Sequence, residues 1–245
     1  MVVLRSYRAF VARLLDPLSR LSGLMLLVAV DAHHRYRAVA KEIVGKTILD
    51  IGGGDKSFFL IGRGNCVSLE LRKLPGVQAV GSATSLPFRS NSFDCVLCVD
   101  TIEHIPRTLR SAAVLEMKRV ARRRVIIHTP VQGGSTYVGR SYDLAFNEWH
   151  KLRKRKDERN TKEHIINIQP TARELEGQDF ILKGTHNAAL WMSCMKLKFG
   201  LREPLGALIS HVYYLLNENR DHKPPFWGAV GIFDKSQKNF TRVSN

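Results

Sequence analysis

The stretch Thr47–Asp55, read as TILDIGGGD, decides the fold that this sequence predicts. Its apolar residues form a short run that ends at three glycines, which is typical of a buried parallel strand. Glycine lets the backbone turn tightly and approach a ligand that a Cβ atom would keep away. The next residues, Lys56–Ile61, have a helical pattern, so we expect the turn to present the N-terminus of a helix to a bound molecule.

A second apolar run, Val67–Leu71 (VSLEL), follows and carries Glu70 near its end. In a strand–helix–strand unit, an acid about 20 residues after the glycines lies beside the ribose of a bound nucleotide or nucleoside. A tight turn without a ligand is the alternative for the glycines alone, because the full dinucleotide pattern has a third glycine where Ser57 stands.

The block Gly81–Pro106, GSATSLPFRSNSFDCVLCVDTIEHIP, makes the prediction specific. It combines a Leu-Pro-Phe turn at 86–88, a Ser-Phe-Asp strand start at 92–94 and Glu-His-Ile-Pro at 103–106. With the glycine turn and Glu70, these motifs resemble the class I S-adenosylmethionine (SAM) dependent methyltransferases. The resemblance is closest to the small-molecule branch that includes the quinone-biosynthesis enzymes, and it covers residues 47–130 well.

The resemblance implies an α/β fold, namely a Rossmann-like, seven-stranded, mostly parallel sheet with flanking helices. The length of 245 residues fits one such domain with additions. We expect residues 1–45 to form an N-terminal helical extension that packs on or caps the core. Residues 46–245 would then form the methyltransferase domain, with an inserted lid at 131–168.

The remaining elements follow from hydrophobic pattern and capping signals. We expect helices at 33–43, 106–122 and 171–177 and within 187–217, the third of them opened by a capping box of Thr171 and Glu174. We expect strands at 78–80, 93–99, 125–127, 180–185 and 226–234, the last of them antiparallel, and we interpret the arginine run at 122–124 as a solvated corner.

The resemblance also assigns the residues that bind SAM. Asp50 and the amides of the glycine turn would hold its methionine part, and Glu70 its ribose hydroxyls. Ser82 stands where the family usually has an acid for the adenine amino group, so adenine recognition would use backbone groups and Leu71. The full cofactor set is Asp50, Gly52, Gly53, Gly54, Glu70, Leu71, Ser82, Ala83, Asp100 and Thr101.

Methyl transfer from a sulfonium depends mainly on alignment of the acceptor, because the leaving group is already activated. A general base is needed only for a hydroxyl acceptor that must lose its proton. His104 is the first candidate, since it follows the fourth strand on the ligand side, and His128 and His164 come next. For these last two we favour a structural or surface role. Asp100, Thr101 and Glu103 would line the side of the SAM site from which the methyl group is transferred.

The charge is the unusual feature of the composition, with 38 Lys+Arg against 22 Asp+Glu and a net charge of +16. Such a charge attracts nucleic acid, anionic lipid or phosphorylated substrates. The basic run Lys151–Lys156 with nearby aromatic residues fits single-stranded nucleic acid or a substrate lid, and we favour the lid. A non-catalytic binding module is a further alternative, against which Asp50 and Glu70 argue.

The cysteines and the N-terminus bear on location. Cys95 and Cys98 form a CxxC pair, but in a strand they point to opposite faces, so we expect packed thiols and no metal site. Free thiols predict a reducing, cytoplasmic setting. The apolar run Leu24–Val30 is too short to span a bilayer. We favour N-terminal helices that pack on the sheet over a basic amphipathic helix on an anionic membrane. The predicted acceptor is a small molecule or a lipid- or glycan-linked group, methylated on oxygen.

Overall fold

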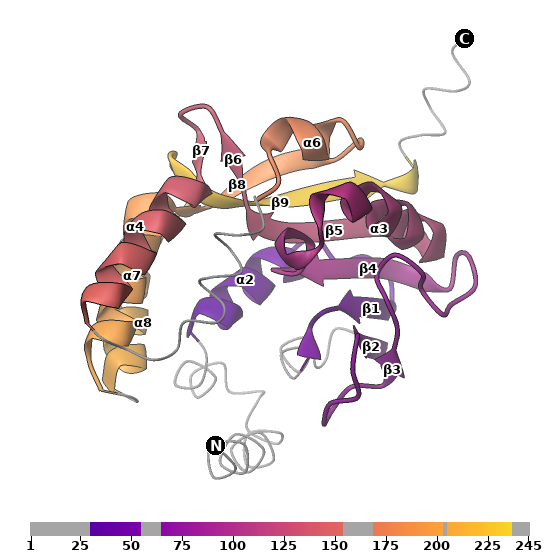
Figure 1. Cartoon of the computed structure of the whole chain (residues 1–245), viewed down its shortest axis with the longest axis horizontal. Coiled ribbons are helices and arrows are strands. Elements are labelled where there is room, and N and C mark those ends of the chain that lie inside the picture. Colours follow the sequence, from indigo (N-terminus) through magenta and orange to yellow (C-terminus); the bar gives the residue numbers. More distant parts are fainter. Residues whose placement is uncertain (1–29, 55–64, 154–168, 203–204, 237–245) are drawn as a thin grey trace.

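The computed structural model describes residues 30–54, 65–153, 169–202 and 205–236. Within these residues, a single mixed sheet forms the centre of the molecule, with helices on both of its faces and at one end (Figure 1). The expected helix at 56–61, the N-terminal residues 1–29 and His164 lie outside the described residues.

Five parallel strands form the first half of the sheet in the order β3-β2-β1-β4-β5. They are β1 (Thr47–Ile51), β2 (Asn65–Glu70), β3 (Ala79–Val80), β4 (Phe93–Val99) and β5 (Ala121–Pro130). The strand order reverses between β1 and β4. In open α/β sheets, ligands bind outside the carboxyl ends of the strands at such a reversal.

The second half of the sheet is mostly antiparallel, with a single parallel pairing of β7 and β9. Strand β9 (Phe226–Asp234) pairs with β5 on one side and with β8 (Ile181–Asn187) on the other. Two strands of two residues each, β6 (Gln132–Gly133) and β7 (Tyr137–Val138), form a hairpin that reaches β9. This hairpin begins the segment predicted to be a lid. The predicted α/β class with a mostly parallel central sheet is confirmed, but the sheet of the described residues has nine strands and not the predicted seven.

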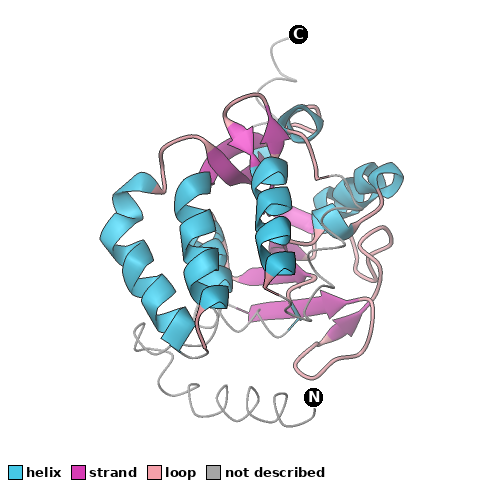
Figure 2. Cartoon of the chain, turned by 60° about the vertical axis from the view of Figure 1, so that its left-hand side comes forward, coloured by secondary structure: helices cyan, strands magenta, loops and turns pink. Residues whose placement is uncertain are grey.

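The helices divide into two groups. Helix α2 (Val30–Ala40) lies on one face of the sheet, and α3 (Arg107–Val120) and the short α6 (Ala172–Glu176) lie on the other (Figure 1). Helices α4 (Gly139–Leu152), α7 (Ala188–Gly200) and α8 (Leu205–Asn217) run side by side in a layer of their own (Figure 2). The 3-10 helices are η3 (Ile102–His104) and η4 (Glu218–Arg220). In the described part of the chain, no helix is long and apolar enough to span a membrane.

The core has two parts, because successive strand residues face opposite sides of the sheet. One cluster contains Leu49 and Cys98 and packs beneath α3, and the other contains Ile48 and Cys95 and packs beneath α2. The two cysteines are free thiols on opposite faces, as the sequence predicts. The capping box of Thr171 and Glu174 is also confirmed.

The arginine run at 122–124 is solvated as predicted at Arg122 and Arg123, which are exposed, but it is not a corner. It belongs to β5, where Arg122 donates to Asp94 at 2.6 Å and Arg124 donates to Asp234 at 2.6 Å. The acids come from β4 and β9, the two strands beside β5, so the charges of Arg122 and Arg124 are paired across the sheet.

Candidate active site

The glycine turn after β1 brings the backbone against the ends of two other strands. Gly52 and Gly54 have positive φ angles of +74° and +54°, which favour glycine. A Cβ atom on Gly52 would clash with the side chain of Thr101, just after β4, and one on Gly54 would lie 3.2 Å from Oε1 of Glu70, at the end of β2. The structure therefore brings together the turn, Glu70 and Thr101, which the sequence assigns to one site.

Asp50 supports this turn from within the protein. Its side chain is fully buried, and its Oδ2 accepts a hydrogen bond of 2.8 Å from the hydroxyl of Tyr36 on α2. Burial, followed by the charge of Asp50, raises the pKa of Tyr36 well above its usual value, so the phenol stays protonated and donates. The bond ties α2 to the carboxyl end of β1. A direct contact of Asp50 with the cofactor stays a prediction.

The expected adenine and ribose residues lie at the neighbouring edge. Glu70 is half-buried, and Leu71 beside it is 72% exposed. Glu70 pairs with Val80 in the sheet, so Ser82 and Ala83 follow at the same edge. The Ser82 hydroxyl is 2.8 Å from the hydroxyl of Thr84 and accepts from its amide at 3.2 Å, which closes a local turn.

Asp100 connects β4 to α2 and β5. It has a positive φ of +47°, its Oδ1 lies 2.9 Å from Nδ1 of His128, and its Oδ2 pairs with Arg35. Nε2 of His128 is 3.3 Å from the Thr185 hydroxyl. Burial, followed by the charges of His186 and Arg35, lowers the pKa of His128 well below its usual value, so the imidazole is neutral. Both of its nitrogens are engaged, which matches the structural role favoured for it.

Glu103 does not line the ligand wall, so that expectation was wrong. It is fully buried, and its Oε2 accepts from the Thr129 hydroxyl at 3.1 Å. Arg110 donates to its backbone carbonyl at 3.2 Å. The η3 turn carries this side chain into the core. His104, at the end of η3, is half-buried, and its role as a base stays a prediction.

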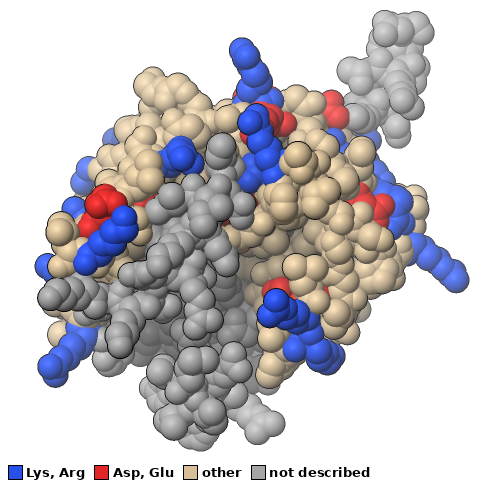
Figure 3. Space-filling model, in the orientation of Figure 1, with Lys and Arg blue, Asp and Glu red and all other residues tan. Residues whose placement is uncertain are grey.

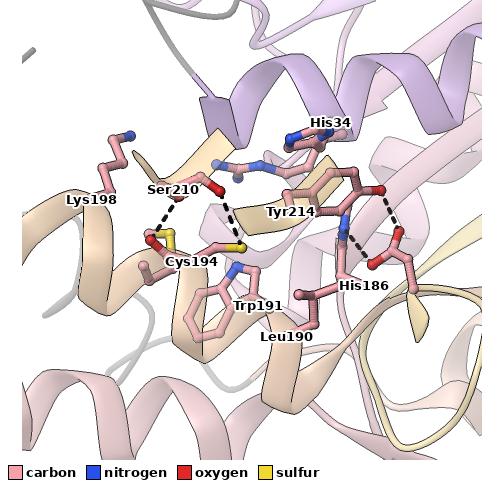
Figure 4. A pocket seen from close by; sticks show the side chains of 11 residues that line it. His34, His186, Leu190, Trp191, Cys194, Lys198, Ser210 and Tyr214 are labelled. Atoms are coloured by element: carbon pink, nitrogen blue, oxygen red, sulfur yellow. Dashed lines mark hydrogen bonds and ion pairs between the residues drawn. The ribbon is translucent and has the colours of Figure 1, made fainter. Parts of the chain in front are cut away.

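A second polar group, which sequence reasoning missed, lies at the end of β8. His186 has a positive φ of +58°, and its Nδ1 lies 3.7 Å from Oδ1 of Asp221. Tyr214 donates to the other oxygen of Asp221 at 2.9 Å (Figure 4). Burial opposes ionisation of Asp221, but its contacts with His186 and Tyr214 outweigh burial and lower its pKa to about 2. Asp221 is therefore a carboxylate at neutral pH.

His186 lines a pocket between α2, α7 and α8 (Figure 4). Its Nε2 is buried and has no hydrogen-bond partner among the residues that the structure describes. The pocket walls include Arg35, Leu190, Trp191 and Met195. The space open to water is about 30 Å³, enough for one or two water molecules or the reacting end of a ligand.

The pocket adjoins the Asp100 side of the site. The rings of His186 and His128 are 5.3 Å apart, and His128 contacts Asp100 directly. Arg35 belongs to both places, because it pairs with Asp100 and lines the pocket. The ring of Trp191 stacks on the ring of Trp227 of β9, with 4.7 Å between their centroids, and forms the pocket wall on that side. The aromatic pocket that contains His186 therefore lies next to the buried His128–Asp100 contact at the strand ends.

Comparison with known proteins identifies the domain. Residues 62–128 match the family model described as "Methyltransferase domain". The matched residues include β2, β3 and β4 and most of β5. This match supports the enzyme class predicted from the sequence, a SAM-dependent methyltransferase, and with it SAM as the cofactor. The small-molecule branch stays a prediction.

Solved structures similar to the chain include known and possible methyltransferases. The chain is similar to a SAM-dependent methyltransferase from Thermotoga maritima, described as a possible histamine N-methyltransferase, with 17% identity and a TM-score of 0.52. That match covers 91% of this chain and 99% of the other. It is also similar to the YcgJ protein of Bacillus subtilis, with 16% identity and a TM-score of 0.44, over 82% of this chain and 97% of that one. No curated protein matches the chain.

Proposed function

We propose that this methyltransferase moves the methyl group of SAM to a hydroxyl oxygen of a small-molecule, lipid- or glycan-linked acceptor. The reacting end of the acceptor would enter the pocket between α2, α7 and α8. One observation carries the proposal: an imidazole beside a carboxylate, His186 with Asp221 at 3.7 Å, lines a pocket near the carboxyl ends of the strands.

The residues at the strand ends fit SAM. The turn at Gly52 and Gly54 brings the backbone close to Thr101 and Glu70, and the Glu70 carboxylate would accept hydrogen bonds from ribose hydroxyls. The exposed Leu71 would cover one side of the adenine. When bound, SAM supplies a methyl group on a sulfonium, so these residues need only bind and orient it.

His186 would act as the general base. Its buried Nε2 would take the proton of the acceptor hydroxyl while the C–S bond breaks and the new C–O bond forms, leaving a methyl ether and the demethylated cofactor. Asp221 would orient Nδ1 and stabilise the imidazolium that results. Tyr214 fixes Asp221 by a hydrogen bond. His104, the base predicted from the sequence, is the competing assignment.

The lining of the pocket favours an acceptor with an apolar part. Leu190, Trp191 and Met195 supply apolar and aromatic contacts, and Arg35 supplies a positive charge. In Figure 3, the Lys and Arg side chains of the described residues occur in several separate groups on this face.

The test uses SAM labelled in its methyl group, with hydroxyl-bearing small molecules, lipids and glycans as acceptors. We expect a labelled methyl ether, and we expect His186→Gln to lower the rate at least about a hundredfold without changing SAM affinity. The matched control is His222→Gln, an exposed histidine next to Asp221. A product methylated on nitrogen would contradict the acceptor class. A full rate in His186→Gln together with a loss in His104→Gln would contradict the base.

A further inference from the structure

Helix α8 faces water with its apolar side. Its thirteen residues include no Asp, Glu, Lys or Arg. The buried positions are Gly206, Ala207, Ser210, His211 and Tyr214. The opposite face consists of large aliphatic side chains whose exposed fractions range from 36% to 78%, namely Leu205, Leu208, Ile209, Val212, Leu215 and Leu216. Surface helices normally place their apolar face inward.

Internal contacts of the polar residues fix this orientation. The Ser210 hydroxyl donates to the Cys194 carbonyl of α7 at 2.8 Å, and Tyr214 donates to Asp221. The ring of His211 stacks on His34 of α2 at 5.0 Å. Rotating the helix to bury its aliphatic face would break all three contacts. The aliphatic face therefore points outward as a consequence of the packing around the pocket.

Basic side chains border the aliphatic face. Arg202 precedes α8, and Arg220 and Lys223 follow it, all of them exposed. At the adjoining end of α4, Leu152 is 84% exposed, and its neighbour Arg153 donates to the Gly200 carbonyl at the end of α7 at 3.4 Å. The arrangement is an apolar strip with cations at its rim, on a chain of net charge +16.

We infer that the outer face of α8 docks the protein onto an anionic lipid bilayer. The aliphatic side chains would enter the boundary between headgroups and acyl chains, and the Arg and Lys side chains at the rim would contact lipid phosphates. A second copy of the chain is the competing occupant. It fits less well, because a two-fold contact through this face would bring two basic rims together.

Docking through α8 would place the pocket near the lipid. Ser210 and Tyr214 line the pocket from the inner side of the same helix whose outer side carries the aliphatic strip. A lipid-linked acceptor could then reach the pocket from the bilayer surface. The docking itself does not rest on the proposed methyl transfer, since it follows from α8 and its rim alone.

The experiment measures binding of the full chain to vesicles of phosphatidylcholine, alone and mixed with phosphatidylserine. We expect binding to the anionic vesicles that weakens as salt is added. The double variant Leu208→Ser, Leu216→Ser should bind the anionic vesicles at least tenfold more weakly. The matched control, Leu109→Ser with Leu115→Ser, removes two exposed leucines of α3 and should leave it unchanged. Circular dichroism and SAM titration show that each variant is folded.

Three results would overturn the inference. The first is no binding of the wild-type chain to either kind of vesicle. The second is equal binding of the α8 variant and the wild type, which would assign the contact to another part of the chain. The third is a wild-type dimer that the α8 variant converts to a monomer, which would assign this face to a second copy.

Discussion

Replacing Glu70 by alanine tests the cofactor site at its best-defined side chain. The carboxylate is half-buried at the end of β2, and its Oε1 lies 3.2 Å from where a Cβ of Gly54 would be, so it stands directly against the glycine turn. A carboxylate that accepts hydrogen bonds from ribose contributes about 1.5–3 kcal/mol. Its loss should weaken SAM binding by roughly 10- to 150-fold.

Calorimetric titration of SAM and of its demethylated product measures this loss. Both ligands carry the same ribose, so Glu70→Ala should weaken both by a similar factor. The control is Glu148→Ala on α4, whose carboxylate is 68% exposed and pairs with Lys151 at 2.8 Å. Unchanged affinity in a folded Glu70→Ala protein would refute the assignment of ribose to this edge.

Two further substitutions test the supporting structure. Gly52→Ala should abolish SAM binding and lower the stability of the fold, because the new Cβ meets both a positive φ and the Thr101 side chain. Gly76 also has a positive φ, of +82°, but faces open space, so Gly76→Ala should lower the free energy of unfolding by only about 1–2 kcal/mol. Equal unfolding midpoints for the two variants would contradict the close approach at Gly52. The Asp94 carboxylate accepts hydrogen bonds from the backbone amides of Lys46 and Thr47 and from the Arg122 side chain. The two amides are the main cause of its lowered pKa. Asp94→Asn should therefore lose about 1.5–3 kcal/mol at neutral pH in denaturant unfolding. Because folding lowers the pKa of Asp94, its carboxylate stabilises the fold at pH values above the unfolded-state pKa of about 4. This stabilisation is lost as the pH falls toward the folded-state pKa, so the difference in stability between Asp94→Asn and wild type should shrink in acid. A constant difference would count against the assignment.

The sequence predicts the half of the fold that depends on local signals. The glycines after β1 predict a turn because their neighbours in the chain are apolar and strand-like. Strand β4 has the predicted bounds, Phe93–Val99, and the capping box at Thr171 is present. The family resemblance assigns the cofactor residues, which lie close together because the carboxyl ends of parallel strands meet at one edge, and their contact with SAM stays a prediction.

Features that depend on distant partners were not predictable. His186 and Asp221 lie 35 positions apart, in segments that carry no motif, and their contact forms only once α7 and α8 have packed. Glu103 turns inward because Thr129, on another strand, offers it a hydrogen bond.

The outward aliphatic face of α8 has a similar origin. Its pattern of apolar residues predicts a helix but not which side faces the protein. Ser210 and Tyr214 determine which side faces the protein, because they donate hydrogen bonds to residues of α7 and of the segment after η4.

A crystal structure with the demethylated form of SAM would test the central claim most directly. We expect the ribose hydroxyls within hydrogen-bond distance of Glu70, the amino-acid part at the glycine turn, and the sulfur on the Asp100 side, facing the pocket lined by His186. A ligand bound elsewhere, or a sulfur turned away from that pocket, would contradict the proposed site of methyl transfer.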